Sequence, residues 1–152
     1  MKLDATDLKL LRLLQQNSKR TTKEYGLLLG LSVTATYERI RRLEKTGVIT
    51  KYVALVDKKK VNRSFVVLCH VKLTQHTKDH IAQFEREVLQ LDEVVECHHI
   101  SGDYDYILKI YVGDMEAYRD FMVTKLTALN HIGSTQSAFV IKEVKNNTEI
   151  PL

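Results

Sequence analysis

Apolar residues recur at helical spacing in the first third of the chain. Five leucines form one stripe along residues 4–17, which predicts an amphipathic helix that Asp4 or Thr6 can cap. A second, shorter helix is expected over residues 23–30, capped by Thr21 or Thr22 and ended at Gly30, because glycine accepts the left-handed conformation common at helix ends.

A third helix is expected after Ser32, which can cap it. At 100° per residue, one arc of about 80° gathers its most apolar positions, which must face the first two helices. These positions are Val33, Thr36, Ile40 and Leu43. The opposite side is polar and basic, with two residues on its borders: Thr34, Glu38, Arg41, Arg42 and Lys45 lie outside, and Tyr37 and Arg39 border them.

Two short helices joined by a glycine turn, the second with a basic outer face, indicate a helix-turn-helix. The amino-terminal part of such a helix can enter a DNA major groove while its arginines reach phosphates or guanine edges. The candidate DNA-binding residues are Ser32, Thr34, Tyr37, Glu38, Arg39, Arg41, Arg42 and Lys45. The alternative is a solvated basic helix in an ordinary bundle.

The period of the pattern changes after this module. Residues 48–57 alternate loosely, as a strand or wing would, and the lysines at 58–60 mark an exposed connection. Then follow the patterns of strand 64–73, helix 79–91, strands 94–100 and 104–112, helix 115–129 and strand 137–144. This β-α-β-β-α-β order fits one antiparallel sheet with both helices on one face, an α+β fold. The bare face predicts a homodimer or larger assembly.

The two parts of the chain differ in their balance of charged residues. The first 60 residues carry 14 Lys and Arg against 6 Asp and Glu, whereas the remainder carries 9 against 13. This asymmetry favours a polyanion-binding module attached to a second domain, although a basic surface without a partner is the alternative. No apolar run is long enough for a membrane helix and the amino terminus lacks a signal-peptide core, so a soluble, cytoplasmic protein is expected.

The remaining chemistry argues against an enzyme. Cys69 and Cys97 fall in expected strands and suit buried thiols; no nucleophile-base set, glycine-rich phosphate loop or recurrent metal-ligand spacing is present. Between the second and third strands, Gly102 allows a ligand close to the backbone, and Asp103 and Asp105 could receive an ammonium group. From the residues alone, a plain hairpin with solvated acids is the favoured interpretation of this stretch.

Three stretches together resemble the Lrp/AsnC (leucine-responsive, feast/famine) family of transcription regulators: LDATDLKLLRLLQQNSKRT, LGLSVTATYERIRRLEKTGVITKYVALVD and SGDYDYILKI. The resemblance implies a winged helix-turn-helix domain (1–50), a hinge strand (51–63), a ferredoxin-like, ACT-like ligand-sensing and oligomerisation domain (64–145) and a tail (146–152). It also implies dimers that pair through their sheets and assemble further, often to octamers.

The resemblance further implies binding of double-stranded DNA and of an amino acid effector, with no cofactor and no metal. The implied effector residues are Gly102, Asp103, Tyr104, Asp105, Ser134, Thr135 and Ser137. Three positions depart from the family pattern, namely Gly26 for alanine, Glu38 for a frequent arginine and Asn62 for glycine. Two rivals are an architectural DNA-wrapping protein without an effector and, more distantly, a small enzyme.

Overall fold

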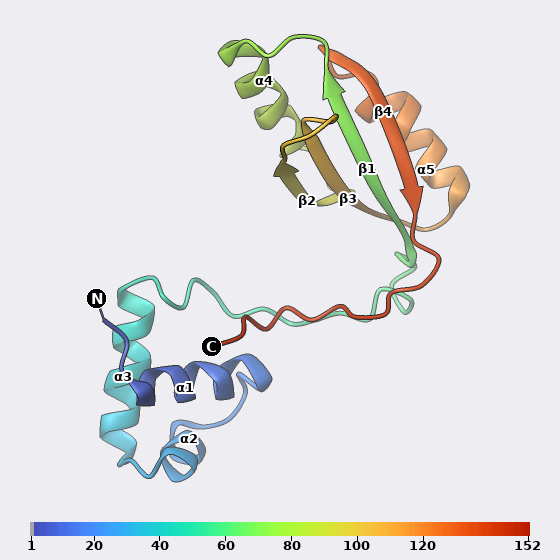
Figure 1. The fold of residues 1–152 in the computed structure, drawn as a ribbon. Coiled ribbons are helices and arrows are strands. Elements are labelled where there is room, and N and C mark those ends of the chain that lie inside the picture. Colours follow the sequence, from blue (N-terminus) through green and yellow to red (C-terminus); the bar gives the residue numbers. More distant parts are fainter. Residues whose placement is uncertain (1) are drawn as a thin grey trace. The chain divides into compact units, whose positions relative to one another are not determined.

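The computed structural model describes residues 2–152, which form two compact units (Figure 1). The first contains the chain up to Leu55 together with Lys145–Leu152, and the second contains Val56–Val144. The last eight residues therefore join the amino-terminal unit, although 89 residues separate them from it in the sequence.

The amino-terminal unit is built from three helices, α1 (Ala5–Gln16), α2 (Thr22–Leu29) and α3 (Val33–Lys45). Each begins at a side-chain cap: Asp4, Thr21 and Ser32 accept hydrogen bonds from backbone N–H groups of the first turns. Gly30 ends α2 in the left-handed conformation, with φ 68°. The core contains Leu10, Leu11, Leu14, Tyr25 and Leu43. The three expected helices and their caps are thus present.

Residues 50–57 form neither a helix nor a strand, so the expectation of a strand or wing over 48–57 is wrong for this chain. Exposed apolar side chains, among them Val53 and Leu55, explain the strand-like pattern of this segment. The carboxy-terminal tail instead contacts α1. The amide of Gln15 accepts from the Ile150 N–H at 2.7 Å and donates to the Ile150 carbonyl at 3.0 Å, and Arg12 Nε donates to the Leu152 carbonyl at 2.7 Å.

The second unit contains one four-stranded antiparallel sheet in the order β2-β3-β1-β4. Its strands are β1 (Phe65–Leu73), β2 (Val94–His99), β3 (Tyr106–Val112) and β4 (Ile132–Phe139). Helix α4 (Lys78–Val88) connects β1 to β2, and α5 (Met115–Phe121) with the π-helical turn η1 (Met122–Leu126) connects β3 to β4. The expected β-α-β-β-α-β order is confirmed.

Both helices pack on one face of this sheet (Figure 1). Phe84 of α4 and Phe121 of α5 lie in the core with alternate residues of β1 and β3. Along β3, every second residue from Tyr106 to Val112 is buried and the residues between are half-buried. The half-buried positions, which include Leu68, Ile107 and Tyr111, form the helix-free face.

Two expected elements differ from the structure. The helix expected over 115–129 changes at Met122 into a π-helical turn, in which the Thr127 N–H donates to the Met122 carbonyl at 2.9 Å. The last strand, expected over 137–144, covers residues 132–139. Sequence reasoning followed the apolar run after Ala138, whereas pairing with β1 places Ile132 opposite Leu73 and Phe139 opposite Val67. The polar start of this strand is therefore paired sheet.

Candidate functional site

The basic face of the amino-terminal unit depends on how closely α2 and α3 approach. A Cβ atom on Gly26 would lie 2.9 Å from the Leu31 carbonyl oxygen and 3.1 Å from Thr36 Oγ1, so only glycine fits without a shift. Thr36 itself is fully buried and donates its hydroxyl to the Ser32 carbonyl at 2.9 Å. This tight turn fixes the start of α3, where a helix presents its first side chains to a ligand.

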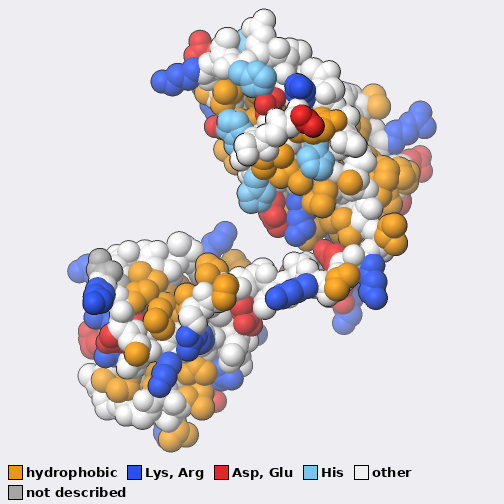
Figure 2. All heavy atoms as spheres, in the orientation of Figure 1, with side chains coloured by type: hydrophobic (Ala, Val, Ile, Leu, Met, Phe, Trp, Pro, Cys, Tyr) orange, Lys and Arg blue, Asp and Glu red, His pale blue; other side chains and the backbone are white. Residues whose placement is uncertain are grey.

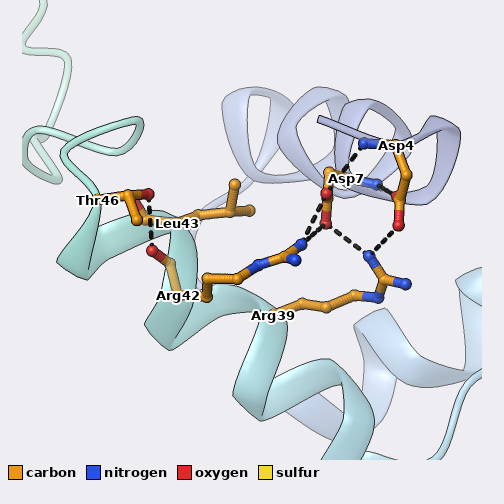
Figure 3. Close-up of polar contacts among 6 residues, drawn as sticks. All are labelled: Asp4, Asp7, Arg39, Arg42, Leu43 and Thr46. Atoms are coloured by element: carbon orange, nitrogen blue, oxygen red, sulfur yellow. Dashed lines mark hydrogen bonds and ion pairs between the residues drawn. The ribbon is translucent and has the colours of Figure 1, made fainter. Parts of the chain in front are cut away.

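The middle of α3 is tied to the start of α1 by ion pairs (Figure 3). Asp7 lies among the core leucines with its side chain 1% exposed, and its Oδ1 is 2.7 Å from both Arg39 Nη1 and Arg42 Nη2. Arg39 Nη1 is also 2.7 Å from Asp4 Oδ2. A buried carboxylate without such partners would be strongly destabilising. We call these four residues, Asp4, Asp7, Arg39 and Arg42, the Asp7 cluster.

These contacts shift the pKa values of Asp4 and Arg39. The hydrogen bond from Arg39, followed by that from the Asp7 backbone, lowers the pKa of the Asp4 carboxyl, and the same aspartates raise the pKa of Arg39. Arg39 therefore stays charged, and the side chains of both arginines are directed at α1. The sequence-based arrangement at 100° per residue had placed Arg42 on the outer side of this helix. A long arginine side chain can nevertheless reach back across the helix surface to a buried acid.

Six of the eight candidate DNA-binding residues remain exposed on α3 without contact to the Asp7 cluster. They are Ser32, Thr34, Tyr37, Glu38, Arg41 and Lys45. Arg41 Nη1 donates to the Tyr37 hydroxyl at 3.3 Å, which holds the two side chains together on the outer surface. Sequence reasoning missed Asp7, although the signal was present: an acid shares a helical stripe with Leu10, Leu11 and Leu14.

The effector residues implied by the resemblance group at one end of the sheet. Asp105 precedes β3, and its backbone N–H donates to the Val71 carbonyl at 2.9 Å. Its Oδ2 accepts from the Leu73 N–H at 2.7 Å, and its Oδ1 lies 2.7 Å from His76 Nε2. Burial raises the pKa of Asp105, but the hydrogen bonds from Leu73 and His76 outweigh it and lower that pKa overall. The carboxylate is therefore ionised and anchored.

On the other side of β1, the start of β4 carries the polar candidates. Thr135 is paired with Val71 and Ser134 with Lys72, so both lie at the same sheet end as Asp105. Ser137 is two residues further along and points to the helix-covered face, where its Oγ is 2.6 Å from the Tyr118 hydroxyl. The structure thus places Ser134 and Thr135 near the end of β1 that Asp105 contacts, and commits Ser137 to a core hydrogen bond.

Gly102, Asp103 and Tyr104 occupy the turn between β2 and β3. Gly102 adopts φ 131°, a conformation that side chains rarely accept, and the Ile100 N–H closes the turn on the Asp105 carbonyl at 2.8 Å. The Tyr104 ring packs on His70, with centroids 5.4 Å apart. The turn is therefore the hairpin that the sequence indicated, with Asp105 directed to Leu73 and His76.

The described residues offer little to other chemistries. Within residues 2–152, no three His, Cys, Asp or Glu side chains are placed to hold a metal ion, and no helix is long and apolar enough to cross a bilayer. Burial raises the pKa of the Cys69 thiol and, together with Glu85, raises the pKa of Cys97 to about 11. Thiols in this state are poor nucleophiles.

Comparison with known proteins identifies both units. Residues 3–44 match the AsnC-type helix-turn-helix domain, and residues 66–150 match the Lrp/AsnC ligand binding domain. The chain belongs to the Lrp/AsnC family of transcription regulators. As a member of this family it is a DNA-binding regulator with a ligand-binding domain, and not an enzyme.

Relatives cover nearly the whole Lrp/AsnC chain. The leucine-responsive regulatory protein of Haemophilus influenzae is 37% identical over 150 residues, covering 99% of this chain and 90% of its own. The Bkd operon transcriptional regulator of Pseudomonas aeruginosa is 34% identical over 150 residues, covering 99% and 98%.

Two solved structures share the fold. An AsnC family transcriptional regulator from Agrobacterium tumefaciens superposes with a TM-score of 0.94 at 35% identity, covering 98% of this chain and 97% of its own. A transcriptional regulator from Neisseria meningitidis, solved as its L-Met complex, also gives 0.94, at 32% identity, covering 99% and 97%.

Proposed function

We propose that this Lrp/AsnC regulator reads DNA with the outer face of α3 and that binding of an amino acid at the Asp105 end of the sheet changes its assembly and DNA affinity. The observation that carries the proposal is that two groups of residues along α3 make different contacts. Arg39 and Arg42 hold the helix on α1, whereas Thr34, Tyr37, Glu38, Arg41 and Lys45 are left on its outer face.

Each outer residue has a distinct role in this proposal. Ser32 and Thr34 stand at the helix start, where they approach base edges or phosphates in the major groove. Tyr37 and Glu38 contact bases, glutamate being suited to accept from the cytosine amino group. Arg41 and Lys45 neutralise phosphates and set the salt dependence of binding.

The effector half of the proposal is supported by chemistry at the sheet end. An amino acid offers an ammonium group, which suits the ionised Asp105, and a carboxylate, for which β4 offers a hydroxyl donor on either face, from Ser134 opposite Lys72 or from Thr135 opposite Val71. The L-Met complex of the Neisseria meningitidis regulator supports an amino acid as the class of effector. The proposed site uses Asp105 and a hydroxyl of Ser134 or Thr135, with Gly102, Asp103 and Tyr104 forming the turn beside it.

The helix-free face of the sheet supports a homodimer, assembling further to an octamer in this proposal. Ligand binding between subunits alters DNA affinity by favouring one assembly state, which is the coupling that regulation needs. An effector-independent DNA-wrapping protein shares the same basic surface, so a ligand response is what separates the two functions.

The DNA half is tested by fluorescence anisotropy of labelled operator DNA in increasing salt. We expect Arg41→Ala and Lys45→Ala each to weaken binding and to reduce the slope of log K against log salt by about 1. Lys142→Ala, in the second unit, serves as the control and should leave both unchanged. Unaltered binding in the Arg41→Ala, Lys45→Ala double variant would contradict this placement.

The effector half is tested by a thermal-shift screen of the twenty standard L-amino acids, with light scattering to record size changes. Wild-type protein should be stabilised by at least one amino acid, and Asp105→Ala should lose that stabilisation while Asp103→Ala retains most of it. If no amino acid has any effect on stability, size or DNA affinity, the effector-independent function replaces this proposal.

A further inference from the structure

The six histidines of the chain all lie in the second unit, several of them on the surface seen in Figure 2. One of them, His76, contacts the carboxylate of Asp105, which we propose binds the effector. It lies in the loop between β1 and α4 with its side chain 57% exposed, and its Nε2 is 2.7 Å from Asp105 Oδ1. Nothing in the sequence pattern singled it out.

Both carboxylate oxygens of Asp105 have a hydrogen-bond partner. Oδ2 accepts from the Leu73 backbone N–H, a bond that fixes the carboxylate at the sheet end whatever ligand is present. Oδ1 is the oxygen that a ligand can use, and the His76 imidazole is already on it. An ammonium group that approaches Asp105 therefore meets His76 as a competitor.

We propose that His76 competes with the ammonium group of the effector for Oδ1 of Asp105, so that effector affinity rises as pH increases through the titration range of imidazole. This inference rests on the proposed function. A protonated imidazole makes a charge-assisted hydrogen bond with the carboxylate, which the effector must displace. Because the imidazole is charged only when it is protonated, the competition is stronger in mildly acidic solution and weaker above neutrality.

Other ionisable groups surround this pair. The electrostatic effect of His99 in β2 lowers the pKa of Asp105, and Lys78 and Asp79 begin α4 directly after the His76 loop. Asp103 and Tyr104 belong to the adjacent turn, Tyr104 packs on His70, and His80 stacks on His131 with centroids 3.8 Å apart. All of these remain in a His76 variant, so the difference between that variant and wild type isolates the contribution of His76.

The test compares His76→Ala with His98→Ala. His98 is a matched control because it is 61% exposed and pairs with a carboxylate, Glu96, at 3.3 Å on β2. The amino acid that most stabilises the wild-type protein in the screen is titrated by calorimetry at pH 6.0 and 7.5. Wild type and His98→Ala should bind about two- to fivefold more weakly at pH 6.0, the range expected of an exposed ion pair. His76→Ala should bind more tightly at pH 6.0 by that factor and lose most of the pH dependence.

Three results would overturn the inference, and they are distinguishable. An unchanged pH ratio in His76→Ala would remove His76 from the competition and leave amino acid binding intact. Weaker binding by His76→Ala at both pH values would make His76 a direct effector contact instead. Failure of wild type to bind any standard amino acid at either pH would defeat the proposed effector and this inference together.

Discussion

Asp7 is the residue on which the placement of α3 depends most. Its carboxylate is buried in the core of the amino-terminal unit and accepts from Arg39 and Arg42, which come from the middle of α3. It also accepts from the Asp4 N–H at 3.1 Å, completing the capping box of α1. One acid therefore helps to cap the start of α1 and pairs with two arginines of the helix that we propose reads DNA.

We expect Asp7→Asn to lower the free energy of unfolding by about 1–3 kcal/mol, because an amide keeps the volume but removes the counter-charge of Arg42 and leaves Arg39 with Asp4 alone. Chemical denaturation followed by circular dichroism measures this. Glu38→Gln removes one negative charge from the exposed surface of α3 and should change stability by less than about 0.5 kcal/mol. Equal stability of Asp7→Asn and wild type would contradict a structural role for the cluster.

Two carboxyls at helix starts predict how the protein responds to acid. The hydrogen bond from Arg39 lowers the pKa of Asp4, and that from the Thr21 backbone lowers the pKa of Glu24. A folded-state pKa below the unfolded value adds stability that is present above about pH 4 and is lost as pH falls through the lowered value. Thermal unfolding between pH 5 and pH 2.5 should show a decline that is shallower in Asp4→Asn. An identical decline in that variant would exclude Asp4 as a contributor.

At the scale of elements, the α2–α3 turn is set by one missing side chain. Gly26 lies where α2 crosses the Leu31–Ser32 turn, and the nearest obstacle to a Cβ is a backbone oxygen, which cannot rotate away. An alanine would gain about 1 kcal/mol of helix propensity, so the clash and the propensity act in opposite directions. The clash outweighs the gain in propensity, because the backbone itself must move to relieve a contact at 2.9 Å.

We therefore expect Gly26→Ala to lower the free energy of unfolding by about 1 kcal/mol or more and to weaken DNA binding, because α3 is displaced relative to α2. Leu28→Ala, at an exposed position of the same helix, is the control and should be nearly neutral in both assays. A Gly26→Ala protein that is more stable and keeps full DNA affinity would contradict this prediction, because it would mean that the turn can shift at little cost.

The second unit, considered as a whole, has one covered and one open sheet face. The covered face holds the core, whereas the open face presents Leu68, Ile107 and Tyr111 at half-buried positions. Lys58 lies over the Tyr111 ring at 5.1 Å and pairs with Glu143, so the segment before β1 shields one edge of this face. The rest is the surface that we propose a second copy covers.

Ile107→Glu tests that assembly, because a carboxylate on the open face would have to be desolvated at an interface. We expect the variant to keep its circular dichroism spectrum and to run as a smaller species in light scattering. Val123→Glu, 66% exposed on η1 at the helix-covered side, should assemble as wild type does. An Ile107→Glu protein of unchanged size would place the interface elsewhere.

Local signals in the sequence were sufficient for most of the fold. Asp4, Thr21, Ser32 and Gly30 mark helix ends by short-range chemistry, and each acts in the structure as expected. Long-range facts were not accessible in the same way. The start of β4 depends on register with β1, and the inward turn of Arg42 depends on an acid 35 residues earlier. His76 was missed because its significance comes only from its distance to Asp105.

The attachment of residues 145–152 to the first unit affects how the protein should be divided for study. A clone that stops at the hinge would omit Ile150 and Leu152, and so would remove the partners of Gln15 and Arg12 on α1. An independent helix-turn-helix fragment should carry this segment fused behind residue 55 through a short flexible linker. Removing residues 145–152 would, conversely, alter the unit formed by residues 2–55.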